Sequence, residues 1–163
     1  MAKAVVKKRN YSLFIRLILR HLLVSKLTIL LALTCVIGSV MMTWASLSLG
    51  LSLILSLVAM IALFIAGTLL HELVHFIVLD TDVSILINDH LIRLEILNHI
   101  TPHRLYLATV AGPLTPTVIG LIVLKHYPEY FLALTPLLLQ SISIIPDLGG
   151  ILGLMGEECA TSN

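Results

Sequence analysis

An almost uninterrupted apolar run from about Leu49 to Leu79 constrains the fold of this chain more than any other feature. A bilayer core of about 30 Å needs about 20 helical residues, so this run can cross a membrane with some tilt or protrusion. Hydrophobic residues make up 58% of the 163 residues and charged residues only 12%, whereas soluble domains average roughly 45–50% and 25%. We therefore expect an integral membrane protein.

Three other apolar segments are expected to cross the membrane as well. They cover about residues 27–46, 105–124 and 130–155, and Pro146-Asp147-Leu148-Gly149-Gly150 interrupts the last of them. Pro113 and Pro116 predict a bent helix in the second of these segments. The sequence therefore predicts an all-α polytopic membrane protein with about four transmembrane helices.

The only internal polar stretch, residues 80–104, separates the second and third expected transmembrane helices. Within it, residues 83–87 and 91–96 are rich in β-branched side chains, and the polar segment Asn88-Asp89-His90 lies between them. Two such runs around a polar turn are typical of a β-hairpin. We expect a small hairpin between transmembrane helices 2 and 3.

Basic residues are concentrated at the amino end of the chain. Residues 11–26 mix cations with large apolar side chains, which predicts an interfacial amphipathic helix whose cations reach the lipid phosphates, or an extension of the first transmembrane helix. Residues 1–10 are expected to be disordered or to lie along the headgroups. The net charge of +1 gives no reason to expect a nucleic-acid partner. Seven of the ten lysines and arginines precede the first long apolar run: Lys3, Lys7, Lys8, Arg9, Arg16, Arg20 and Lys26.

This basic amino end is expected to stay in the cytoplasm by the positive-inside rule. Four spans then place both termini on the cytoplasmic side of what we expect to be the cell membrane. The same topology brings His71, His75, Gly112, Pro113 and Asp147 to similar depths near the cytoplasmic side. The expected organisation is a basic cytoplasmic or interfacial segment (1–26), a membrane domain (27–156) and a tail (157–163).

The sequence His71-Glu72-Leu73-Val74-His75 lies near the end of the long apolar run. Histidines four residues apart share one face of a helix, so both imidazoles can bind one Zn²⁺. A glutamate beside that ion can take a proton from a zinc-activated water without being a ligand. Because ionisable groups in a membrane helix are costly and usually functional, we predict two ligands and a general base. The alternative is a buried polar pair that bonds to a neighbouring helix.

A catalytic zinc site usually has three protein ligands and one open position. Asp147 is the only acidic residue expected inside the third and fourth transmembrane helices, where an unpaired carboxylate is expensive. We therefore predict Asp147 as the third ligand of one zinc ion per chain. The alternative is a buried aspartate paired with His103, Arg104 or a threonine hydroxyl. The weaker candidate ligands are Asp80, Asp82, His90, His99, His103, Glu157 and Glu158.

Two features suggest how a substrate reaches such a site. The pair Gly112-Pro113 either bends its helix or lets an extended substrate approach the zinc. An exposed hairpin edge beside the site either pairs with an unwound substrate or belongs to an ordinary cytoplasmic loop. The sequence leaves both pairs of alternatives open.

Together these motifs resemble the site-2 protease family of intramembrane zinc metalloproteases. The resemblance covers about 110 residues, a core of about 47–156, and rests on His71-Glu72-Leu73-Val74-His75, Ala111-Gly112-Pro113 and Pro146-Asp147-Leu148-Gly149-Gly150. It implies zinc ligands at His71, His75 and Asp147, a general base at Glu72, and the family's hairpin at residues 83–96. The chain length leaves no room for a PDZ-like or CBS-like domain, which implies a minimal member.

The chain departs from the family pattern at two places. Members often carry an asparagine shortly after the Gly-Pro pair, where this chain has Thr115 and Thr117, and another before the last motif, where it has Ile144 and Ile145. Those asparagines help to position the substrate or the oxyanion. Thr115, Gln140 and Ser141 are candidates to replace these asparagines. The residues that we expect to bind the substrate are Gly112, Pro113 and Thr115.

The expected function is zinc-dependent hydrolysis of peptide bonds in a membrane-spanning or membrane-inserted peptide, with the bilayer as surroundings. One alternative is a Ste24-like membrane zincin, which takes a distant glutamate as third ligand and usually has more spans. The other is a non-enzymatic metal-binding membrane protein or a degenerate protease homologue.

Overall fold

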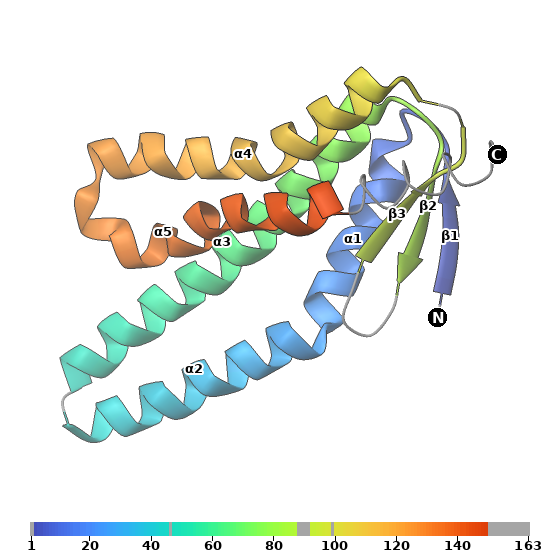
Figure 1. The fold of residues 1–163 in the computed structure, drawn as a ribbon. Helices are drawn as coiled ribbons and strands as arrows, with labels where there is room; N and C mark the ends of the chain where they lie inside the picture. Colours follow the sequence, from blue (N-terminus) through green and yellow to red (C-terminus); the bar gives the residue numbers. More distant parts are fainter. Residues whose placement is uncertain (1, 46, 88–91, 99, 150–163) are drawn as a thin grey trace.

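The computed structural model describes residues 2–45, 47–87, 92–98 and 100–149. Three long helices, α2 (Lys26–Ala45), α3 (Leu47–Leu79) and α4 (Pro102–His126), form most of it. A small sheet gathers at the end where α3 finishes and α4 begins (Figure 1). Helix α3 is central, because α1, α2, α4 and α5 all pack against it.

Two helices of the described residues are long and apolar enough to cross a membrane. They are Ile54–Leu79, which is most of α3, and α4. Helix α1 and the first part of α2 add a third crossing only if this bent pair is a single span. The structure thus confirms a mostly helical protein with two helices of spanning length.

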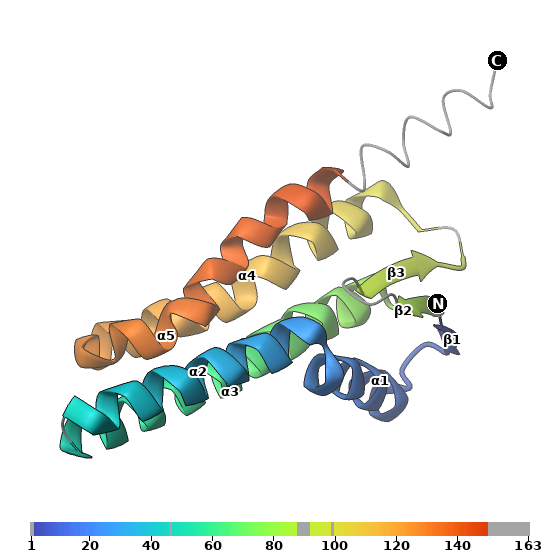
Figure 2. The ribbon, with the colours of Figure 1, turned by 90° about the horizontal axis from the view of Figure 1, so that it is seen from below.

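The segment expected to form the fourth transmembrane helix is not one regular helix. Helix α5 (Phe131–Leu138) lies between two 3₁₀ turns, η1 (Pro128–Tyr130) and η2 (Leu139–Ser143), and helical geometry continues from residue 144 to 149. Pro136 inside α5 has no backbone N–H to donate. The segment nevertheless returns along α4 and α3 (Figure 2), and this brings its last residues back toward the sheet end.

Helix α1 (Tyr11–Val24) is separated from α2 by a bend at Ser25. Ser25 between them has an extended backbone, with φ −63° and ψ 142°. Its hydroxyl accepts a hydrogen bond from the Thr28 N–H at 3.2 Å, as a helix cap does. The helix Tyr11–Val24 and the stretch Thr28–Gly38 are bent by 49° from each other.

The sheet has three strands, whereas the sequence predicted two. Strands β2 (Val83–Ile87) and β3 (Ile92–Ile96) are antiparallel and confirm the predicted hairpin. Strand β1 (Ala2–Val6) pairs antiparallel with β2, with Val6 opposite Val83, and gives the order β1-β2-β3. The expectation that residues 1–10 are disordered is therefore wrong for this strand. The strand is held in place by burial, because Val6 of β1 and Val83 of β2 are both 0% exposed.

A compact apolar cluster joins the sheet, α1 and α3. The Phe14 ring of α1 stacks on the Phe76 ring of α3, with centroids 4.4 Å apart and planes 4° from parallel. The other buried members of the cluster are Val6, Ile18, Leu22, Val83 and Ile85. Because Phe76 directly follows His75, this cluster fixes the end of α3 that carries the predicted metal ligands.

Candidate metal centre

Three candidate ligand atoms meet between α3 and the last described segment. His71 Nε2 and His75 Nε2 lie 2.9 Å apart, and each lies 3.4 Å from Asp147 Oδ2. Within the part of the chain that the structure describes, this is the one group of three His, Cys, Asp or Glu side chains with ligand atoms so close together. The fold thus brings together the three residues that the sequence singled out from separate motifs.

The separations suit a small divalent ion. Two ligand atoms on a tetrahedral zinc with bonds of about 2.05 Å lie about 3.35 Å apart, which matches both nitrogen–oxygen distances of 3.4 Å. From the three measured separations, a point about 0.8 Å outside the plane of the atoms lies about 2.05 Å from each, a zinc–histidine bond length. The three atoms are therefore close enough to share one metal ion.

Burial at the centre also fits a bound cation. The His71 side chain is only 5% exposed, and the side chains of His75 and Asp147 are 12% and 28% exposed. Asp147 Oδ2 is buried and has no hydrogen-bond partner among the described residues. Its nearest polar partners are the two histidine Nε2 atoms at 3.4 Å, and a metal ion between these three atoms would compensate the buried carboxylate charge.

Ser143 contacts His71 on the side of the ring away from Asp147. Its Oγ lies 3.2 Å from His71 Nδ1 and donates to the backbone carbonyl of Gln140 at 2.7 Å. Metal-binding histidines usually have such a partner on the second ring nitrogen, which fixes the ring orientation. The sequence analysis did not identify this residue. The signal available was its position four residues before Asp147, on the same helical face.

Gly112 brings α4 against the second histidine. A Cβ at this position would lie 2.7 Å from Cε1 and 2.8 Å from Cδ2 of His75, closer than real Cβ atoms approach. Only glycine therefore lets the α4 backbone pass this close to the imidazole. This close approach gives Gly112 a packing role at the site, and its contact with a substrate stays a prediction.

The other residues predicted to bind substrate lie next to this contact. Pro113 is fully buried, and the Thr115 hydroxyl donates to the Ala111 carbonyl at 2.7 Å. The amide of Gln140 donates to the hydroxyl of Thr68 on α3 at 3.2 Å. Ser141 donates to the Leu138 carbonyl at 2.9 Å. The three candidates to replace the family's asparagines therefore all bond within the protein.

Glu72 lies beside the ligands without being one of them. It follows His71 directly, so its side chain leaves α3 about 100° around the helix axis. The residue is half-buried. A carboxylate in this position can exchange protons with a molecule at the centre.

The weaker candidate ligands that the structure describes do not join the group. Asp80 contacts the Lys8 ammonium at 2.8 Å and the Arg104 guanidinium at 3.8 Å, and Asp82 accepts from the Lys8 N–H at 2.6 Å. The hydrogen bond from Lys8, followed by its charge and those of Arg9 and Arg104, holds the pKa of the Asp80 carboxyl below its ordinary value. His103 is exposed. The candidates His90, His99, Glu157 and Glu158 lie outside the described residues.

Comparison with known proteins adds no relative to this picture. No protein-family model, curated protein or solved structure matches the chain.

Proposed function

We propose that this chain is an intramembrane zinc metalloprotease, similar to the site-2 protease family, that hydrolyses peptide bonds of membrane-embedded proteins or peptides. The observation that carries the proposal is the convergence of His71, His75 and Asp147 at distances that suit one ion. The two histidines lie on a helix of spanning length, and Glu72 lies between them in the sequence. These are the parts that metal-assisted hydrolysis requires.

Each residue has a defined task in this proposal. His71, His75 and Asp147 would hold a zinc ion, which would supply the Lewis acidity needed to polarise the scissile carbonyl and to acidify a water molecule. Glu72 accepts the proton of the attacking water and later delivers it to the leaving amine. Gly112 lets α4 pack closely enough to limit the space beside His75.

The proposed topology has four membrane crossings with both termini in the cytoplasm of the cell. The concentration of basic residues before residue 27 supports this orientation. So does the position of the sheet and of the charged cluster around Asp80, which adjoin the end of α3 nearest the metal centre. Peptide bonds would therefore be cut near the cytoplasmic side of the membrane.

The proposed substrate binds in extended form. Strand β2 is the middle strand of the sheet, and β1 and β3 are its edges. A helical substrate shields its peptide bonds, so it must unwind, and an edge strand can pair with the unwound segment. We assign this pairing to β3, which precedes α4 in the chain and completes the hairpin.

The two alternatives fit the site less well. A Ste24-like zincin requires a distant glutamate as third ligand, whereas the carboxylate beside both histidines belongs to Asp147. A non-catalytic metal protein has no use for a carboxylate in the position of Glu72.

The test is a comparison of cells that produce the wild-type chain, Glu72→Gln or Glu129→Gln at equal levels. Glu129 is exposed and lies beyond the far end of α4, so its replacement is a matched control for loss of one carboxylate. New peptide termini in membrane proteins are identified by mass spectrometry. General acid–base groups contribute about 10²- to 10⁴-fold, so we expect the products to fall at least a hundredfold with Glu72→Gln only. Unchanged products with Glu72→Gln would exclude the proposed chemistry.

A further inference from the structure

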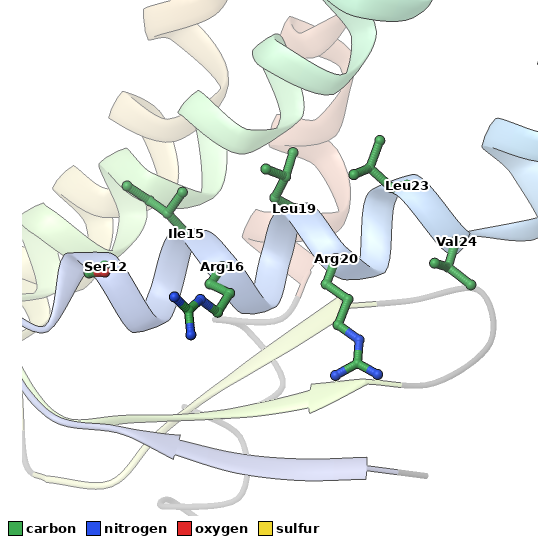
Figure 3. A pocket seen from close by; sticks show the side chains of 7 residues that line it. All are labelled: Ser12, Ile15, Arg16, Leu19, Arg20, Leu23 and Val24. Atoms are coloured by element: carbon green, nitrogen blue, oxygen red, sulfur yellow. The ribbon is translucent and has the colours of Figure 1, made fainter.

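Helix α1 presents a surface that the proposed chemistry does not use. Ile15, Leu19 and Leu23 form an apolar stripe, and Arg16 and Arg20 form a cationic stripe beside it. All five side chains line one shallow groove. Figure 3 shows the apolar side chains leaving α1 toward the side where α3 runs, and the guanidinium groups leaving toward the side where the strands lie.

The spacing of the sequence produces this division. The members of each stripe are four residues apart, so they lie above one another along the helix. A third stripe, Phe14, Ile18 and Leu22, is buried in the cluster with Phe76. Helix α1 therefore has one side that packs against the rest of the protein, one apolar side and one cationic side. Leu23 is 56% exposed, and both arginines are exposed.

The amino-terminal region around α1 is rich in basic residues and has no acidic ones. Residues 1–26 contain seven lysines and arginines and no aspartate or glutamate. Two guanidinium groups one helical turn apart present paired N–H donors, a geometry that suits phosphate oxygens. A basic amphipathic helix with an apolar side is also the pattern that lies in a membrane interface.

We propose that this surface of α1 binds anionic phospholipid, with the lipid phosphate at Arg16 and Arg20 and an acyl chain along Ile15, Leu19 and Leu23. An anionic lipid is favoured over a zwitterionic one because it carries no ammonium group to cancel the charge that the two arginines attract. The proposal requires a membrane but does not depend on the metal centre or on proteolysis.

The position of α1 gives this binding a structural consequence. Its buried side stacks Phe14 on Phe76, which directly follows His75. A lipid bound on the outer sides of α1 therefore holds, at the membrane surface, the helix that packs beneath the metal-binding end of α3.

The experiment places a fluorescent reporter in the apolar stripe. Trp44 is the only tryptophan, so the variant Trp44→Phe with Leu23→Trp has a single emitter beside Arg20. The protein is reconstituted in phosphatidylcholine bilayers that contain brominated phosphatidylglycerol, or brominated phosphatidylcholine in a parallel series. Quenching by the two brominated lipids gives the association constant of phosphatidylglycerol relative to phosphatidylcholine at this site.

Each basic residue at an anionic membrane surface strengthens binding by a factor of about five. We expect phosphatidylglycerol to be preferred in the reporter protein, and Arg16→Gln with Arg20→Gln to lower that preference about 25-fold. The matched control, Lys7→Gln with Lys125→Gln, removes the same charge elsewhere and leaves the preference within twofold. An equal loss in the control would assign the preference to net charge and overturn the site.

Two further measurements test whether the bound phosphate belongs to a lipid and whether the apolar stripe of α1 faces the bilayer. Inorganic phosphate at 50 mM, roughly physiological in ionic strength, should leave the quenching by brominated phosphatidylglycerol unchanged. Loss of that quenching when inorganic phosphate is added would show that the site binds a free anion and not a lipid. Quenching by brominated phosphatidylcholine should persist in every variant, because the apolar stripe still meets acyl chains. Its absence in the reporter protein would overturn the proposed orientation of α1.

Discussion

The Ser143 hydroxyl links His71 to the protein backbone, with 3.2 Å to His71 Nδ1 and 2.7 Å to the carbonyl oxygen of Gln140. A serine hydroxyl has one proton. When that proton goes to the Gln140 carbonyl, Oγ can only accept from His71, so the imidazole carries its proton on Nδ1. The lone pair on Nε2 is then directed at His75 and Asp147, as a metal ligand requires.

The first prediction follows from this contact. Ser143→Ala removes the acceptor for Nδ1–H, and loss of such a partner typically weakens metal binding about 10- to 100-fold. Ser143→Thr keeps a hydroxyl and should restore zinc affinity, measured by competition with a chelating dye. Ser141→Ala is the matched control, because it removes a nearby hydroxyl that donates to the backbone carbonyl of Leu138. Wild-type affinity in Ser143→Ala would remove the serine from the site.

The close approach of α4 to His75 gives the second prediction. Gly112→Ala places a methyl group on the imidazole, and overpacking of this kind costs about 1–3 kcal/mol. We expect zinc affinity to fall by about one to two orders of magnitude. Gly38→Ala meets nothing within 4 Å and should bind zinc as the wild type does. Equal affinities in the two variants would show that α4 does not press on His75.

The stacked pair Phe14 and Phe76 gives the third prediction. Phe14 is 0% exposed, and truncation of a buried phenylalanine costs about 3–5 kcal/mol. Phe14→Ala should therefore lower the unfolding temperature in detergent micelles and speed amide exchange along α1. Leu23→Ala, at a residue that is 56% exposed, should change stability by no more than about 0.5 kcal/mol. Similar effects of the two changes would mean that α1 is not docked.

The Asp80 cluster gives a pH prediction for the attachment of β1. The hydrogen bond from Lys8 lowers the pKa of Asp80 in the folded protein. This contribution is therefore fully present above the unfolded value of 3.8 and is lost as pH falls through the lower, folded value. Amide exchange of β1, corrected for intrinsic rates, should rise below about pH 4.

Two variants check this assignment. Asp80→Asn should show faster exchange of β1 already at neutral pH and no further rise through the acid range. Glu129→Gln, which removes an exposed carboxylate at the other end of α4, should follow the wild type. A wild-type acid response in Asp80→Asn would place the titrating group elsewhere.

Sequence reasoning located the site because its signals are local or set by membrane depth. The spacing of His71 and His75 is a property of one helix, and the depth of Asp147 follows from counting residues along apolar segments. The hairpin was also visible, because residues 83–96 form it with neighbouring residues. The apolar pattern likewise gave both helices of spanning length.

Other features depend on contacts between distant segments, which no local pattern encodes. Strand β1 pairs with residues about 80 positions later, and its short alternation of alanine, lysine and valine is polar enough to look unstructured. Gly112 looked like a bend or a substrate path until its distance to His75 was known. The sequence places the interruption of the last segment at residues 146–150, whereas helical geometry continues from residue 144 to 149 and the 3₁₀ turn η2 interrupts the segment earlier.

The most direct test of the central claim is the zinc content of the purified protein, measured by elemental mass spectrometry. The wild type and the double variant Glu157→Ala with Glu158→Ala should each hold about one zinc ion per chain, and Asp147→Ala should hold less than about a tenth of that, because the third of three ligands is lost. Glu72→Gln should keep its zinc. Full zinc in Asp147→Ala, or its loss only in the Glu157 and Glu158 double variant, would contradict the account.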